Sequence, residues 1–161
     1  EATLLFAEPW QLRVFAASEQ LHPLMFGGLR FAVTGSNGET ESLDTSTEAA
    51  FKQKFGVHIY EGFGATAITP LAAANVPDAI SPGDWSVQIG TKPGTVGLPL
   101  PGCAFSIIDA TTGEEKPLGE EGFVRIGAPF SALQNGESSE LWSLTEVRGR
   151  LDADGFLHLV G

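Results

Sequence analysis

The sequence has few cysteines and few basic residues. Cys103 is the single cysteine among 161 residues, which excludes an internal disulfide framework and a cysteine-based zinc site. Lys and Arg number 9 against 20 Asp and Glu, and the formal net charge is −11. Nucleic acids and anionic lipid surfaces select clusters of Lys and Arg. The charge balance therefore argues against both as partners.

Long apolar runs are also missing. The longest uncharged segments, Gly62–Pro77 and Pro93–Ile108, are shorter than the ~20 apolar residues of a membrane-spanning helix, and Pro and Gly interrupt both. The N-terminus lacks the positive flank of a signal peptide. We therefore expect a cytoplasmic chain without a transmembrane segment. Because the chain begins at Glu1 and stops within an apparent strand at Gly161, we also expect a fragment of a longer protein, one that can itself associate with a membrane.

The first 91 residues are typical of α/β structure. Strand formers alternate over Leu29–Val33, and a helix is predicted over Thr45–Phe55, with Asp44 as its N-cap and Gly56 at a left-handed end. Val57–Tyr60 then fits a short buried strand. Strand, helix and strand at this spacing predict a right-handed βαβ unit.

The remainder of the chain, residues 92–161, favours β structure. Short alternating strands are expected at Cys103–Ile108 and Gly122–Gly127, and a hairpin over Arg150–Val160 turns at Asp154-Gly155. Short strands with Gly-rich turns indicate a small, partly open β-barrel. The predicted fold class is thus α/β plus a small β-barrel, divided into an α/β subdomain over 1–91 and a distorted barrel subdomain over 92–161, with residues 75–90 as a loop.

Two glycine-containing segments follow predicted strands, where open α/β sheets place their ligands. Thr34-Gly35-Ser36 begins one of them, and plain turn formation is the leading alternative for it. In the other, Gly62 and Gly64 allow close approach to the backbone, while Phe63 offers a ring and Thr66 a hydroxyl. A tight turn around a buried aromatic residue is an equal alternative there. No His, Ser or Cys has the spacing of a metal site, a triad or a nucleophile elbow, so we assign no catalytic residue.

Three segments, in order, resemble the adenylate-forming (AMP-binding) ligases, which include acyl-CoA synthetases, adenylation domains and luciferase-like enzymes. Tyr60-Glu-Gly-Phe-Gly-Ala-Thr66 resembles the aromatic-Gly-x-Thr-Glu motif of this superfamily. Lys92–Gly102, with the strands and turns up to Gly122, resembles its connector and small barrel. Gly149–Gly161 resembles the stretch before its hinge. The resemblance implies the centre of the N-terminal domain, with the phosphate loop and the C-terminal domain lying outside this chain.

A narrower resemblance points to fatty-acid chemistry. Leu21–Phe26, Asn75–Asp78 and Trp85–Gln88 look like the acyl-acyl-carrier-protein synthetase half of bifunctional 2-acylglycerophosphoethanolamine acyltransferases, and long-chain fatty acyl-CoA ligases are near neighbours. Such enzymes join a fatty acid to ATP, release pyrophosphate and pass the acyl group to the thiol of CoA or an acyl-carrier protein. Mg²⁺ and basic groups absorb the phosphate charge.

The same resemblance implies a set of nucleotide contacts. By this resemblance, Thr34, Gly35 and Ser36 border the adenine and the acyl pocket. Phe63, between Gly62 and Gly64, stacks on adenine, and the hydroxyl of Thr66 contacts phosphate.

Two residues that the family uses are replaced in this sequence. Ala67 stands in place of the magnesium-binding Glu, and Val147 stands in place of the ribose-binding Asp. A methyl or isopropyl group neither coordinates a cation nor accepts a hydrogen bond. We therefore expect the chain by itself to lack adenylation activity and to bind ATP, AMP and Mg²⁺ weakly or not at all. The alternative is a degenerate, non-enzymatic binding module that keeps the fold, and self-association through uncovered surface is a further hypothesis.

Overall fold

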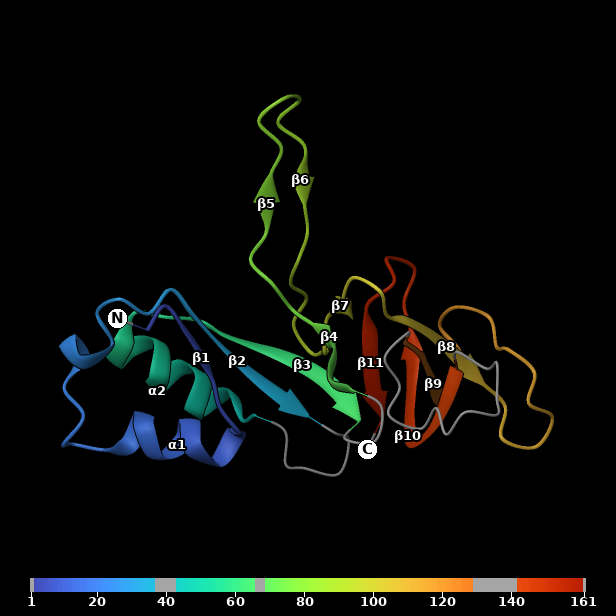
Figure 1. Ribbon diagram of the computed structural model, residues 1–161, viewed down its shortest axis with the longest axis horizontal. Coiled ribbons are helices and arrows are strands. Elements are labelled where there is room, and N and C mark those ends of the chain that lie inside the picture. The colour runs from blue at the N-terminus through green and yellow to red at the C-terminus, as the bar shows by residue number, and fades with distance from the viewer. Residues whose placement is uncertain (1, 37–42, 66–68, 129–141, 161) are drawn as a thin grey trace.

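The computed structural model describes residues 2–36, 43–65, 69–128 and 142–160, and its two main sheets lie side by side (Figure 1). The first sheet has five strands in the order β1-β2-β3-β4-β7. Its first three strands are parallel, and the other two are antiparallel to their neighbours. The strands are β1 (Leu4–Phe6), β2 (Phe31–Ser36), β3 (Ile59–Ala65), β4 (Thr69–Ala74) and β7 (Leu98–Pro99).

The predicted βαβ unit is confirmed. β2 and β3 are parallel neighbours joined through α2 (Thr45–Phe55). The side chain of Asp44 accepts a hydrogen bond from Thr47 N–H at 2.7 Å, and Gly56 ends the helix with a φ of 71°. Among the described residues, no helix is long and apolar enough to cross a membrane.

Two helices cover one face of the first sheet (Figure 1). Leu12 of α1 (Pro9–Ala17) and Phe51 of α2 are fully buried there against Ala32 and Ile59 of the strands. A short 3₁₀ helix, η1 (Pro23–Phe26), follows α1. Apolar side chains at helical spacing thus meet the alternating residues of β2 and β3, which is the usual origin of an α/β layer.

The second strand of the unit is longer than predicted. The sequence predicts that the strand ends at Tyr60 and that the glycines follow it in a loop. In the structure β3 continues to Ala65 and includes Gly62. β3 pairs on both sides, with β2 and with β4, and these ladders override the low strand propensity of glycine. A Cβ at position 62 would lie 2.6 Å from the carbonyl oxygen of Ala73, so the close approach of β4 requires glycine here.

The predicted small, partly open barrel is found as an open four-stranded sheet, which is only half of a barrel. Within the described ranges its order is β11-β10-β9-β8, with β8 and β11 as edges. At the outer edge of β11, the backbone of Leu157 forms hydrogen bonds outside the sheet: its C=O accepts from Val96 N–H, and its N–H donates to Gly97 O. The predicted hairpin at Asp154-Gly155 is confirmed. The strands are β8 (Ala104–Ile108), β9 (Gly122–Gly127), β10 (Trp142–Leu151) and β11 (Leu157–Val160).

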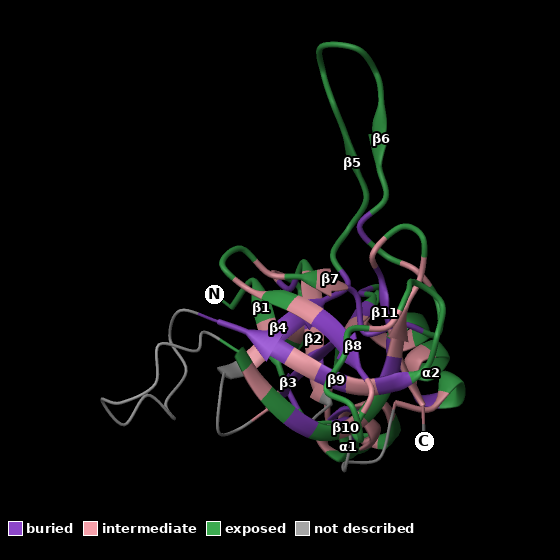
Figure 2. Ribbon diagram, turned by 90° about the vertical axis from the view of Figure 1, so that its right-hand side faces the viewer, coloured by how far each residue is buried: buried purple, intermediate pink, exposed green. Residues whose placement is uncertain are grey.

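The two sheets share a hydrophobic core. Phe63 and Val96 from the first part pack with Val124, Ile126 and Leu157 from the second, and Figure 2 shows buried residues along the strands of both sheets. β7 belongs to the first sheet although it follows the predicted boundary at residue 92, so the change of sheet comes between β7 and β8. The division into two subdomains stays a prediction.

The predicted loop over residues 75–90 contains a further element. β5 (Ala79–Ile80) and β6 (Val87–Gln88) pair as an antiparallel ribbon that projects from the body of the molecule (Figure 1). Each strand has only two residues, which is too short for an alternating pattern to mark it in the sequence.

Candidate functional site

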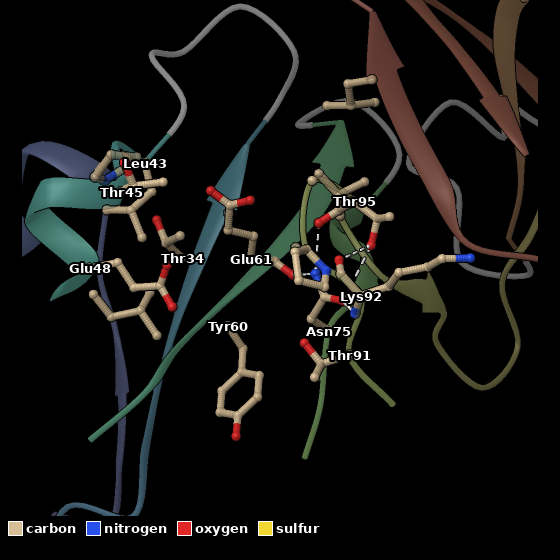
Figure 3. A pocket seen from close by; sticks show the side chains of 18 residues that line it. Thr34, Leu43, Thr45, Glu48, Tyr60, Glu61, Asn75, Thr91, Lys92 and Thr95 are labelled. Carbon is tan, nitrogen blue, oxygen red and sulfur yellow. Dashed lines mark hydrogen bonds between the residues drawn. The ribbon is translucent and has the colours of Figure 1, made fainter. Parts of the chain in front are cut away.

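A pocket of about 430 Å³ lies over the second half of β2 and the first half of β3 (Figure 3). Three parts of the chain form it: the beginning of α2, residues 34–35 of β2 with residues 59–62 of β3, and the connector over residues 91–96. Its edge at Thr34 and Gly35 lies near the carboxyl end of β2, and open α/β sheets place ligands at the carboxyl ends of their strands. Its polar lining residues are Thr34, Thr45, Glu48, Tyr60, Glu61, Asn75, Thr91, Lys92 and Thr95.

Thr34 is the most unusual polar residue of the pocket. Its side chain lies on β2 directly opposite Glu61 of β3, and the residue is only 3% exposed. Its Oγ1 atom has no hydrogen-bond partner among the described residues. Because a buried hydroxyl without a partner is costly, this atom indicates a place for a bound ligand group or water.

Two carboxylates lie on the same side of the pocket. Glu48 comes from the first turn of α2 and Glu61 from β3. Burial, and then the negative charge of Glu48, raise the pKa of Glu61 above its usual value, although a hydrogen bond from Leu43 N–H opposes the shift. The pocket therefore disfavours a second uncompensated negative charge at Glu61.

A buried polar cluster fixes the opposite wall. Asn75 and Thr95 are 5% and 2% exposed. Asn75 Nδ2 donates to Thr95 O at 2.7 Å, and Asn75 Oδ1 accepts from Lys92 N–H at 3.0 Å. The backbone N–H of Asn75 donates to Glu61 O at 2.8 Å, which links the connector to β3. Figure 3 shows these bonds between Asn75, Lys92 and Thr95.

Lys92 connects this wall to the second sheet. Its Nζ atom lies 2.6 Å from Asp152 Oδ2 and 2.9 Å from Asp154 Oδ2, and 5.5 Å from the centroid of the Phe156 ring. The bonds to Asp152 and Asp154 raise the pKa of Lys92, so this cation is already paired within the chain.

The structure brings together three of the predicted site residues. Thr34, Gly35 and Gly62 line the pocket, and Gly35 pairs directly with Gly62 across β2 and β3. Ser36 continues β2, where its backbone pairs with Phe63. Thr66 and Ala67 lie outside the described residues.

Phe63 and Gly64 are buried away from the pocket lining. Phe63 is 0% exposed, and the centroid of its ring lies 6.2 Å from that of Phe105 in the shared core. The stacking of Phe63 on adenine therefore stays a prediction, because the ring has no exposed face in this structure. Val147 lies on β10, half-buried against the same core.

The sequence analysis missed the polar wall and the carboxylates. Asn75 and Thr95 are polar positions inside the two long uncharged runs, and that contrast is the signal that could have marked them. Glu48 and Glu61 carry no such signal, since only the register of β2, β3 and α2 brings them to one pocket. No group of three His, Cys, Asp or Glu side chains that could hold a metal occurs in the described part of the chain.

Residues 1–133 match the model of a family described as AMP-binding enzyme. "Putative acyl--CoA ligase YdaB" of Bacillus subtilis (strain 168) is 28% identical over 120 residues, which are 66% of this chain and 21% of that protein.

Solved structures of the same kind superpose over almost the entire chain. The anthranilate CoA ligase AuaEII, in complex with anthranoyl-AMP, has a TM-score of 0.72 and 26% identity, covering 99% of this chain and 29% of that one. ATP-bound MatB from Rhodopseudomonas palustris has a TM-score of 0.71 and 25% identity, covering 100% and 31%. The chain thus spans less than a third of the length of these relatives. Since the family model covers most of its sequence, this chain belongs to the AMP-binding enzyme family.

Proposed function

We propose that this chain is the central part of the N-terminal domain of an ATP-dependent ligase that activates a carboxylic acid as its acyl-adenylate. The observation that carries the proposal is the pocket over β2 and β3, where Gly35 faces Gly62 and the hydroxyl of Thr34 has no partner among the described residues. Relatives solved with ATP or with an acyl-adenylate support a nucleotide as the ligand.

ATP or AMP would lie against β2 and β3. Thr34 Oγ1 would form a hydrogen bond to it, and the backbone of Gly35 would pack against it. Ser36 and Thr66 are further proposed contacts. We leave Phe63 out of this set because the core covers its ring. The wall held by Asn75 would limit the pocket on the other side.

For the intact ligase, we propose a fatty acid as the substrate and CoA or an acyl-carrier protein as the thiol acceptor. A carboxylate oxygen would attack the α-phosphorus of ATP and release pyrophosphate. The thiol would then attack the acyl carbonyl carbon and release AMP. When bound, Mg²⁺ would neutralise phosphate charge. No described residue is assigned to that ion.

We further propose that this chain by itself does not complete the reaction. Ala67 and Val147 replace two residues with which the family holds the metal and the ribose, and Val147 instead packs beside the shared core. The alternative is a binding module that has kept the fold and lost the chemistry.

Titration calorimetry of the chain with ATP, AMP and a non-hydrolysable acyl-adenylate analogue tests the nucleotide site. Thr34→Val removes the free hydroxyl and nearly preserves the size of the side chain. We expect about fivefold weaker nucleotide binding, because the variant loses one hydrogen bond to the ligand. Thr145→Val is the matched control, because its buried hydroxyl bonds Val124 O at 2.8 Å in the second sheet. Absence of binding by the unmodified chain, or equal losses in both variants, would refute the site.

A further inference from the structure

The ribbon β5-β6 and its flanks, residues 76–89, form an arm on which every residue is exposed. The arm projects from the body of the molecule, as Figures 1 and 2 show from two directions. β5 pairs only with β6 among the described strands. An isolated two-stranded ribbon is marginally stable in water, so packing against another surface would stabilise it.

One face of the arm is apolar. Ile80 pairs directly with Val87, so both side chains lie on the same face, and Ile89 follows Val87 by the two-residue repeat of a strand. These three side chains are 62%, 59% and 58% exposed. Trp85 lies at the tip with 77% of its surface exposed, and its backbone N–H donates to Ser81 O at 3.0 Å.

The arm carries two exposed carboxylates, which are held close to its backbone. Its two acidic residues are bonded to nearby backbone: Asp78 Oδ1 accepts from Gly90 N–H at 2.8 Å, and Asp84 Oδ1 accepts from Ser86 N–H at 3.1 Å. The sequence has no Lys or Arg between Lys54 and Lys92. Neither carboxylate belongs to the pair Ile80 and Val87 within the face, and the absence of basic residues disfavours an anionic lipid surface.

The exposed area is sufficient for a weak dimer. Full burial of the exposed surface of Ile80, Trp85, Val87 and Ile89 on both copies would remove roughly 1,000 Å² from water, which is the lower limit for a specific interface. Because the arm stands away from the body, the negative charges of the two bodies also stay apart.

We propose that the arm is a self-association surface, in which the faces made by Ile80, Trp85, Val87 and Ile89 of two copies pack together about a twofold axis. In such an isologous contact each face is its own complement. The arm begins beside the pocket, because Asn75 and Thr91 on its two sides both line the pocket, but the proposal does not depend on the pocket binding a nucleotide.

Sedimentation velocity of the chain across the micromolar range tests the proposal. We expect a monomer–dimer equilibrium that Val87→Asp weakens at least tenfold, because a charge would be buried without a partner. Gln88→Asp is the matched control: it adds the same charge to the same strand on the opposite face, and dimerisation should persist. Circular dichroism of both variants checks that the body stays folded.

A second variant keeps the test decisive if Val87→Asp fails to fold. In a chain carrying Trp10→Phe and Trp142→Phe, Trp85 is the single tryptophan, and its emission should shift to the blue as concentration rises. A monomer at all concentrations, or equal weakening by both aspartate variants, would overturn the proposal. Flotation of a monomeric chain with phosphatidylcholine vesicles would overturn it in favour of lipid as the occupant.

Discussion

Lys92 and Asp152 are 60 positions apart in the sequence, yet Lys92 Nζ and Asp152 Oδ2 lie 2.6 Å apart. The ion pair joins the connector, which forms one wall of the pocket, to the turn between β10 and β11. His158 Nε2 lies 3.0 Å from the same carboxylate oxygen. Burial alone opposes the charge of Asp152, but the bonds from Lys92, His158 and the backbone together hold its pKa well below the usual range. A single carboxylate thus links the two sheets.

Asp152→Asn should lower the free energy of unfolding by about 2 kcal/mol at neutral pH, the loss typical of charge-assisted hydrogen bonds. Because the pKa of Asp152 is lower in the folded state, its stabilising contribution is fully present above the pKa of the unfolded state, 3.8. The contribution is lost as the pH falls through the folded pKa. Urea denaturation at pH 7 measures the full contribution, and at pH 3, which lies below the unfolded pKa and above the folded one, the contribution should be reduced but still present. Asp154→Asn, whose side chain is 69% exposed, is the control and should change stability by less than about 0.5 kcal/mol. Equal losses in the two variants would contradict this account.

Phe63→Ala should destabilise the chain by about 3–5 kcal/mol, because it empties a fully buried site between the two sheets. Phe63→Leu should restore most of this loss, since it keeps the site apolar and largely filled. Thermal unfolding measures the stability, and calorimetry measures nucleotide affinity at a temperature where both variants are folded. If Phe63→Leu restored stability but left nucleotide binding weak, the ring would contact adenine, and our exclusion of it from the site would be wrong.

Glu61→Gln should raise the melting temperature at pH 7. The raised pKa of Glu61 means that the folded state disfavours its ionised form, a penalty present above the folded pKa and absent below the unfolded value of 4.5. The gain should therefore disappear as the pH is lowered to about 4. Glutamine keeps an oxygen that can accept from Leu43 N–H. Glu120→Gln, at an exposed position, should show no gain at either pH.

Ala67→Glu combined with Val147→Asp should restore pyrophosphate release to the intact ligase, measured with ATP and a fatty acid. The two carboxylates would supply the metal ligand and the ribose acceptor that the family pattern contains. Ala67→Gln with Val147→Asn is the neutral control and should restore less. If the double acidic variant stayed inactive while folded, the binding-module alternative would gain support.

Local signals in the sequence predicted the regular elements well. Asp44 and Gly56 mark both ends of α2 because a side-chain cap and a left-handed glycine act within one turn of the chain. The strand at Gly122–Gly127 and the turn at Asp154-Gly155 depend on similarly short-range patterns. The order of family motifs likewise indicates the adenylate-forming ligases, and the match of residues 1–133 to the AMP-binding enzyme family confirms it.

Long-range pairing was not predictable in the same way. Gly62 was interpreted as a loop residue, but β4 arrives from the other side and makes it the centre of a sheet. The sequence predicts a partly open barrel but does not indicate where it opens, and in the structure β11 bonds to Val96 and Gly97 at the open edge. In each case the deciding hydrogen bonds come from residues distant in sequence, so no local pattern could indicate them.

The sequence by itself determined the family, the βαβ unit and three residues that line the pocket, Thr34, Gly35 and Gly62, because these depend on local propensity and on motifs read in order. The tertiary structure decided which polar groups meet. Asn75 and Thr95 form the far wall of the pocket, and Phe63 lies in the core instead of the pocket. The hydroxyl of Thr34 has no hydrogen-bond partner among the described residues. The physical reason is that burial and hydrogen-bond satisfaction are set by strand register and sheet packing, which are properties of the whole fold.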